Sequence, residues 1–268
     1  MYELKPFVSE KIWGYERWIV STHDAGESLV VKIEDGSTDV PLSKIVGEYP
    51  LLLKVIQAND TLSVQVHPDD EYAGKHENSR GKTECWYVLD AKPNTTLICG
   101  MTGDYSAEEL RAAILENRLE PYMRSVPVEK GDFIFIPAGT VHAINGGLRL
   151  LEVQESSDIT YRLYDWGRGR EVHVEKGLAV TKHLKSDPIK NFKGPFSCEY
   201  FTLKRMDIAA VPVEITDSKD FVLFVIEGNG DIETQGKKIN CKAEDTFYCR
   251  AGEKIKAAEL SLMKITAL

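Results

Sequence analysis

The sequence of 268 residues has no hydrophobic run that approaches the roughly 18 to 20 apolar residues of a membrane helix. Its first residues, MYELKPFVSEKIWG, also lack the basic segment followed by an apolar stretch that is typical of a secretory signal. We therefore expect a cytoplasmic protein with no membrane partner.

Clusters of basic residues are missing as well. There are 33 Lys and Arg residues against 42 Asp and Glu residues, a formal net charge of -9, and no basic stretch of the kind that follows a nucleic-acid backbone. This balance argues against nucleic acid as a partner and favours a small-molecule ligand. Because a Gly-rich phosphate loop is also absent, a phosphorylated ligand would have to be held by separate side chains.

The cysteines exclude two further classes of protein. There are five, an odd number, and none of them shows C-x-x-C spacing. The sequence therefore predicts neither a disulfide framework nor a thiolate zinc site.

Most of the chain consists of short runs rich in Val, Ile, Phe and Tyr, separated by turn residues, such as LLLKVIQ, ECWYVL and DFIFIPAG. Such runs predict an all-β sandwich or barrel. The segment SAEELRAAILENRLE differs, because its apolar residues have helical spacing behind Ser106, and Glu109 stands where a capping box needs it. We expect a small helical insertion near 106–120 and a second possible helical piece at 175–184.

The polar stretch KSDPIKNFKGPFS predicts a domain boundary near residue 190, which gives domains 1–190 and 191–268. A faint repeat relates the two. The segment ECWYVLDAKPN (84–94) aligns with FVLFVIEGNGD (221–231), and KGDFIFIPAGTVH (130–142) aligns with AEDTFYCRAGEKI (243–255). Glu84 then faces Phe221 and His142 faces Ile255, so the chemistry belongs to the first copy.

Among the six histidines, His67 and His142 are the candidates for a metal site. Gln65 and His67 stand two residues apart on a predicted strand, so their side chains emerge on the same face. His142 follows the turn that ends at Gly139, and Glu84 opens another predicted strand. Two imidazoles, a carboxylate and an amide oxygen suit zinc with an open position. The alternative is that Gln65 and His67 form a polar outer face and His142 is a turn residue.

These motifs resemble a known family. Gly131, Pro137, Gly139 and His142 follow the second cupin motif, and the whole pattern resembles the short, bacterial-type type I mannose-6-phosphate isomerases of the cupin superfamily. The resemblance covers nearly all of the first 185 residues and implies two cupin, or jelly-roll, modules, the second degenerate. Matching stretches are KIWGYERW (11–18), LLLKVIQANDTLSVQVHPDD (51–70), GKTECWYVL (81–89), GDFIFIPAGTVHAI (131–144) and LLEVQESSDITYRLYDWGR (150–168).

The resemblance implies the interconversion of D-mannose 6-phosphate and D-fructose 6-phosphate through an enediolate, with one Zn²⁺ per chain or another divalent ion. The implied metal ligands are Gln65, His67, Glu84 and His142. Arg162 matches the family's active-site arginine and suits stabilisation of the enediolate, although a salt bridge to Asp158 or Asp165 is the alternative.

Two residues compete for proton transfer. Lys82 matches a lysine of the family's site, and Glu152 lies in the strand LLEVQE. Expected substrate contacts are Lys54, Ser63 and Asp158. Lys54 is a lone cation in an apolar strand, so it needs a partner or a cavity unless only its stem is buried.

Two other functions are open at this stage: an Fe(II)-dependent cupin oxygenase, because the same ligands suit iron, and a non-catalytic sugar-phosphate-binding cupin. The sequence does not distinguish a monomer from a homodimer.

Overall fold

A computed structural model describes residues 1–31 and 39–268. Two compact units emerge from its internal contacts. The central unit comprises Val8–Arg17 and Leu52–Asn191, and the C-terminal unit comprises Met1–Phe7, Trp18–Leu51 and Phe192–Leu268. The predicted first domain includes the N-terminal segments, whereas in the structure part of them groups with the C-terminal residues because strand β1 (Tyr2–Lys5) pairs with β22 (Thr246–Cys249). The division into domains 1–190 and 191–268 stays a prediction.

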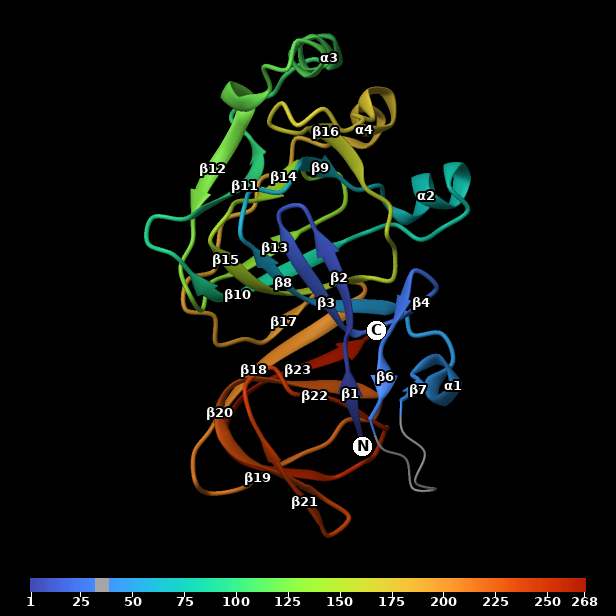
Figure 1. Cartoon of the computed structure of the whole chain (residues 1–268), viewed down its shortest axis with the longest axis vertical. Helices are drawn as coiled ribbons and strands as arrows, with labels where there is room; N and C mark the ends of the chain where they lie inside the picture. Colours follow the sequence, from blue (N-terminus) through green and yellow to red (C-terminus); the bar gives the residue numbers. More distant parts are fainter. Residues whose placement is uncertain (32–38) are drawn as a thin grey trace. The chain divides into compact units, whose positions relative to one another are not determined.

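The expected mainly-β fold is confirmed, and in the central unit it takes the form of two facing sheets (Figure 1). The first sheet has the order β13 (Phe133–Ile136), β10 (Glu84–Ala91), β15 (Leu148–Glu155), β8 (Leu51–Ala58), β3 (Gly14–Val20) and β2 (Phe7–Lys11). The second has the order β12 (Met123–Pro127), β11 (Thr96–Met101), β14 (His142–Ile144), β9 (Val64–Val66) and β16 (Tyr161–Tyr164).

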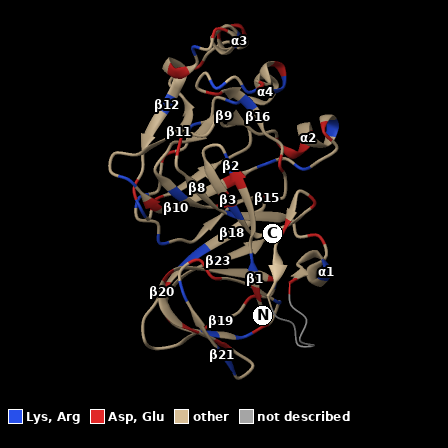
Figure 2. Ribbon diagram, viewed as in Figure 1, with Lys and Arg blue, Asp and Glu red and all other residues tan. Residues whose placement is uncertain are grey.

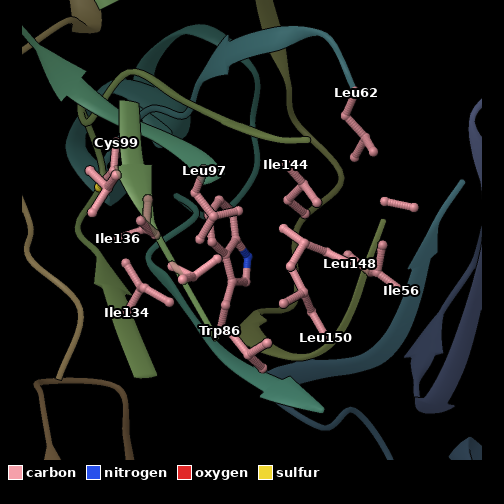
Figure 3. Packing of buried hydrophobic residues seen from close by; sticks show 14 of the residues in the cluster. Ile56, Leu62, Trp86, Leu97, Cys99, Ile134, Ile136, Ile144, Leu148 and Leu150 are labelled. Atoms are coloured by element: carbon pink, nitrogen blue, oxygen red, sulfur yellow. The ribbon is translucent and has the colours of Figure 1, made fainter. Parts of the chain in front are cut away.

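Alternation of side chains along these strands builds two separate cores. The core between the sheets surrounds Trp86, whose ring lies among Leu97, Ile134 and Leu150 (Figure 3). The opposite face of the five-stranded sheet packs its Val64 and other apolar residues against helices. That sheet therefore packs against the other sheet on one face and against helices on the other.

Helices α2 (Asp70–His76), α3 (Ala107–Leu115) and α4 (Val174–Val180) belong to the central unit. The predicted capping box is present at α3, where Ser106 caps the helix and Glu109 accepts from the Ser106 main chain. Helix α2 is capped by Asp69, with acidic residues in its first turn and basic residues in its last, which can be followed in Figure 2. None of the helices in 1–31 and 39–268 is both long and apolar enough to span a membrane.

The C-terminal unit is built around one large antiparallel sheet. Its order is β17 (Phe196–Ser197), β18 (Phe201–Ile208), β23 (Ile255–Ala267), β20 (Phe221–Thr234), β22 (Thr246–Cys249), β1 (Tyr2–Lys5), β6 (Leu29–Val30) and β7 (Val40–Pro41), with β19 (Val213–Ile215) on β23 and β21 (Lys237–Cys241) on β20. Shorter elements are the hairpin β4 (Thr22–His23) and β5 (Gly26–Glu27), helix α1 (Ser43–Val46) and, in the central unit, the 3₁₀ helix η1 (Glu120–Tyr122).

The internal repeat predicted from sequence is confirmed by strand register. In the central unit Glu84 pairs with Ile136 across β10 and β13, and in the C-terminal unit Phe221 pairs with Cys249 across β20 and β22. These are equivalent positions of the alignment. Both Phe221 and Ile255, which replace Glu84 and His142, are completely buried in the apolar core of the C-terminal unit.

The replacement of polar by apolar residues predicts the outcome of reversing it. Phe221→Glu should lower the free energy of unfolding of the C-terminal unit by at least about 3 kcal/mol, because it removes buried apolar surface and buries an unpaired carboxyl group. Urea unfolding measures the change. The control Val213→Glu, at an exposed position of β19, should change it by no more than about 0.5 kcal/mol. Equal effects of the two substitutions would contradict a dry core at Phe221.

Candidate metal centre and active site

The space between the two sheets of the central unit is polar at one end. Along β10 and β15 the paired inward residues are Glu84 with Gln154, Trp86 with Glu152, and Val88 with Leu150. The facing sheet aligns His142, Gln65 and Arg162 as neighbours across β14, β9 and β16, so these three side chains share one face. Strand register therefore gathers charged and amide groups beyond Trp86.

Three metal-binding groups converge at this polar end. One ligand atom from each of His67, Glu84 and His142 lies within 4.8 Å of the others, and all three residues are buried. Glu84 Oε1 is 3.4 Å from His142 Nε2, and Glu84 Oε2 is 3.7 Å from His67 Nε2. The amide nitrogen of Gln65, as placed, is 3.3 Å from His142 Nε2. A rotation of this amide would direct its oxygen to the same point.

Main-chain carbonyls orient both imidazoles. His67 Nδ1 is 2.8 Å from the carbonyl oxygen of Ile159, and His142 Nδ1 is 2.9 Å from that of Thr140. Each Nδ1 then carries the proton, which leaves Nε2 as the lone-pair donor. Burial lowers the pKa of His142 to about 4 and lowers the pKa of His67 as well, where Lys82 adds to the effect. Neutral imidazoles of this kind are the form that binds metal.

The Glu84 carboxylate fits a divalent cation. Burial raises its pKa to about 7, against the opposing effect of Lys82. Neither of its buried oxygens accepts a hydrogen bond of ordinary geometry. A completely buried carboxylate that has Lys82 as counter-ion but accepts no well-formed hydrogen bond is costly, and a divalent cation bound by Glu84 and the two imidazoles would supply further compensation. The residues present therefore match the ligand set expected for zinc.

Lys82 reaches into the same cluster. Its Nζ lies 2.9 Å from Glu84 Oε2 and 3.0 Å from His67 Nε2, and the residue is buried. Lys82 stands two residues before Glu84, just outside β10. The local main-chain conformation therefore directs both side chains to the same site.

A second ion pair lies deeper between the sheets. Glu152 Oε1 is 3.1 Å from Lys54 Nζ, and Glu152 Oε2 accepts from Trp86 Nε1 at 2.9 Å. Burial alone would raise the pKa of Glu152, but Lys54, Lys82 and the Trp86 hydrogen bond together lower it to about 2. Burial opposes the charge of Lys54, yet Glu152 and Glu16 raise its pKa above the usual value. Both groups are therefore charged at neutral pH.

The structure places the remaining predicted residues around this cluster. Ser63 is buried directly before β9, and Asp158 is exposed in the loop whose Ile159 carbonyl contacts His67. Arg162 is half-buried, donates from its guanidinium to the carbonyl oxygen of Glu171 at 2.7 Å, and has a buried Nε without a partner. Within the described chain it forms no ion pair, so the alternative salt bridge to Asp158 or Asp165 is not observed.

Comparison with known proteins agrees with this geometry. Residues 15–98 match the model of the phosphomannose isomerase type I catalytic domain. The mannose-6-phosphate isomerase ManA of Bacillus subtilis is 34% identical over 270 residues, covering 84% of this chain and 85% of that protein. The chain belongs to the type I mannose-6-phosphate isomerase family. A mannose-6-phosphate isomerase of Streptococcus mutans is 42% identical over 184 residues, which cover 62% of this chain and 57% of that relative.

A solved structure extends the likeness to the whole fold of this family. The crystal structure of the mannose 6-phosphate isomerase from Bacillus subtilis superposes with a TM-score of 0.89 at 28% identity, covering 100% of this chain and 99% of that one. The four residues that the family resemblance implied as ligands all lie at the polar end of the sandwich here.

Two residues around the polar cluster, Trp86 and Glu16, were not predicted from the sequence. Trp86 contacts His142 at 5.4 Å between ring centroids and holds Glu152 through its indole nitrogen. Glu16, 4.0 Å from Lys54 Nζ, is the second carboxylate beside that ammonium group. The period-two spacing of Glu84 and Trp86 places both on one face and was a usable signal for Trp86.

The Lys54–Glu152 pair makes a testable contribution to stability. The folded-state pKa of Glu152 lies below its usual value, so its contribution is present above about pH 4.5 and is lost as the pH falls toward 2. Glu152→Gln should therefore lower the free energy of unfolding by about 3 kcal/mol near pH 7, because it removes the nearer carboxylate partner of a buried ammonium and leaves only Glu16 at 4.0 Å. Urea unfolding at several pH values measures this difference, which should shrink between about pH 4.5 and pH 2.

The exposed carboxylate of Glu129 in the same unit provides the control for this substitution. Glu129→Gln should change the free energy of unfolding by no more than about 0.5 kcal/mol. A Glu152→Gln effect that did not depend on pH would show that the carboxylate charge is not the source of the stability.

Proposed function

We propose that the chain interconverts D-mannose 6-phosphate and D-fructose 6-phosphate with a divalent metal, zinc in the first instance. The observation that carries this proposal is the buried His67, Glu84 and His142 cluster in a member of this isomerase family. Aldose–ketose exchange moves a proton between two adjacent carbons through an enediolate. The site then needs a proton carrier and groups that stabilise negative charge on oxygen.

The metal would be held by His67, Glu84, His142 and the amide oxygen of Gln65. A bound zinc ion with an open position polarises the substrate carbonyl and stabilises the charge that develops on its oxygen. The side chains of Lys54, Lys82, Glu84 and Glu152 sum to zero charge. A divalent cation among them makes the site net positive, which suits an anionic substrate in a chain of net charge -9.

Of the two candidates for proton transfer, the contacts favour Lys82. Its Nζ lies within hydrogen-bond distance of two metal-ligand atoms, so it stands beside the place where the carbonyl would bind. The pKa of Glu152 is held at about 2 by its partners, which makes this carboxylate a weak base near neutral pH. Glu152 then serves to hold Lys54 and Trp86.

Arg162 is proposed to stabilise the enediolate. Its side chain lies on the same sheet face as Gln65 and His142, and its buried Nε is without a partner. A guanidinium stays protonated under all working conditions and offers several donors in a fixed plane. Such a group stabilises charge and does not act as a base.

Substrate contacts are proposed at Lys54, Ser63 and Asp158, with Lys54 subject to the competition of its carboxylate partners. A cytoplasmic location, and a monomer or homodimer without nucleic-acid or membrane partners, stay predictions. The substrate is a small-molecule sugar phosphate.

Metal removal tests the proposal directly. Dialysis against a chelator should lower the rate of fructose 6-phosphate formation more than about 100-fold, and added zinc should restore it, because the metal supplies several kcal/mol of transition-state stabilisation. A coupled assay and metal analysis of the same sample measure both quantities. Glu84→Gln should lose zinc, whereas the control Glu129→Gln should retain it. Full activity in a sample without metal would disprove the metal-dependent mechanism.

Arg162→Ala tests the role of the guanidinium. The variant should lose about 100- to 1000-fold in kcat, as expected when a donor to a developing oxyanion is removed. Its zinc content should stay that of the wild type. Arg162→Lys should not restore kcat, since a lysine lacks the planar set of donors. Arg111→Ala, which removes an exposed ion pair on α3, is the control and should keep full activity.

A further inference from the structure

The segment that carries Lys82 is held by three consecutive main-chain hydrogen bonds. Gly81 N donates to Asp70 Oδ1 at 2.7 Å, Lys82 N to the carbonyl oxygen of Pro68 at 2.9 Å, and Thr83 N to Glu155 Oε2 at 2.6 Å. Two of the three acceptors are carboxyl groups, and they flank Lys82 on either side. The fit is close, because a Cβ at Gly81 would lie 2.5 Å from main-chain atoms of Asp69 and Asp70.

Glu155 replaces a missing acceptor in the sheet. Glu155 N donates to the carbonyl oxygen of Thr83 at 3.1 Å, which continues the β10–β15 ladder beyond the Glu84–Gln154 pair. In a regular antiparallel ladder the return bond would run from Thr83 N to the main-chain oxygen of Glu155. That oxygen instead accepts from Ser157 N and Gln154 Nε2, each at 2.8 Å. Because the main-chain oxygen of Glu155 is occupied, its side-chain carboxyl accepts the hydrogen bond from Thr83 N instead.

The hydrogen bond from Thr83 N to the Glu155 side chain matters because it is buried. Both Thr83 and Glu155 are buried, so a Thr83 N–H without an acceptor would not reach water. Burial, together with the nearby charge of Asp70, raises the pKa of Glu155 to about 7. A glutamine at 155 keeps an oxygen acceptor for the Thr83 N–H without the carboxyl charge.

We propose that Glu155 and Asp70 are positioning residues, which fix the main chain at 81–83 so that Lys82 and Glu84 stand correctly in the site. The catalytic consequence rests on the isomerase function proposed above. Neither residue lies in the metal-ligand set or among the expected substrate contacts. They act through Thr83 and Gly81, the two neighbours of Lys82.

The test compares Glu155→Met with Glu155→Gln in the zinc-loaded full chain. The two side chains have similar length, but only glutamine offers an oxygen to Thr83 N–H. Glu155→Met should lose about 10- to 100-fold in kcat, in line with other residues that orient a metal site, with a smaller change in KM. Glu155→Gln should stay within about threefold of the wild type. Of these two variants, only Glu155→Met should accelerate the hydrogen exchange of the main-chain amides of residues 81–84.

Asp70 gives a second, exposed position that does not threaten folding. Asp70→Ala should lower kcat and accelerate exchange at Gly81, and Asp70→Asn should preserve both. The control is Glu109→Ala, which removes another carboxylate acceptor of a main-chain N–H, at the α3 capping box. It should leave kcat unchanged. Wild-type kcat in both Glu155→Met and Asp70→Ala would overturn the inference, as would equal losses in Glu155→Met and Glu155→Gln.

The proposed function can fail separately. If the wild-type chain forms no fructose 6-phosphate with zinc bound, the isomerase proposal fails. The exchange comparison still decides the positioning role, because the protection of residues 81–84 does not depend on turnover. Unchanged exchange in both Glu155→Met and Asp70→Ala would then reject that role.

Discussion

Burial of ionisable groups between the two sheets of the central unit is the constraint on which the site depends. Lys54, Lys82, Glu84 and Glu152 are all nearly inaccessible to water, and a charge in such a place is stable only when it is paired and hydrogen-bonded. Lys54 and Glu152 meet this condition more fully, because Glu152 lies 3.1 Å from Lys54 Nζ and one of its oxygens accepts from Trp86. Lys82 and Glu84 meet it only in part, since the oxygens of Glu84 accept no well-formed hydrogen bond. The remaining demand for positive charge is one that a divalent cation at the proposed metal site would meet.

The same strands form the apolar core at one end of the sandwich and the polar cluster at the other, because antiparallel pairing brings residues of like polarity together. From Val88 onward on β10 the inward residues are apolar and form the core, whereas the inward residues around Glu84 are charged or carry an amide. The apolar end supplies the hydrophobic packing that fixes the positions of the strands, and the strands in turn fix the positions of the polar side chains. Trp86 joins the two parts: its ring packs in the core and contacts His142, while its Nε1–H holds Glu152. The geometry of the polar cluster thus follows from ordinary sheet packing.

Local patterns in the sequence predicted the features that depend on near neighbours. The capping box located α3, and the i, i+2 spacing placed Gln65 and His67 together although β9 ends at Val66. Pairings between segments that lie far apart in the sequence could not be predicted from local patterns. That Lys54 needs a partner follows from its apolar surroundings, but that Glu152 is this partner depends on how β8 and β15 lie side by side. The grouping of Met1–Phe7 with the C-terminal residues likewise depends on the pairing of β1 with β22.

The C-terminal unit shows what the module is like without this chemistry. The β20–β22 pair keeps the register of β10–β13, and its tight turn keeps a positive φ, 91° at Gly131 and 71° at Glu244. The side chains at the positions of Glu84 and His142 differ in polarity. Phe221 fills the place of Glu84 with apolar volume, which removes the need for a compensating cation and gives hydrophobic stabilisation instead. A single backbone arrangement therefore supports either a dry core or a charged site. In the central unit the paired lysines offset part of the cost of burying the carboxylates, and the proposed divalent cation would offset more of it.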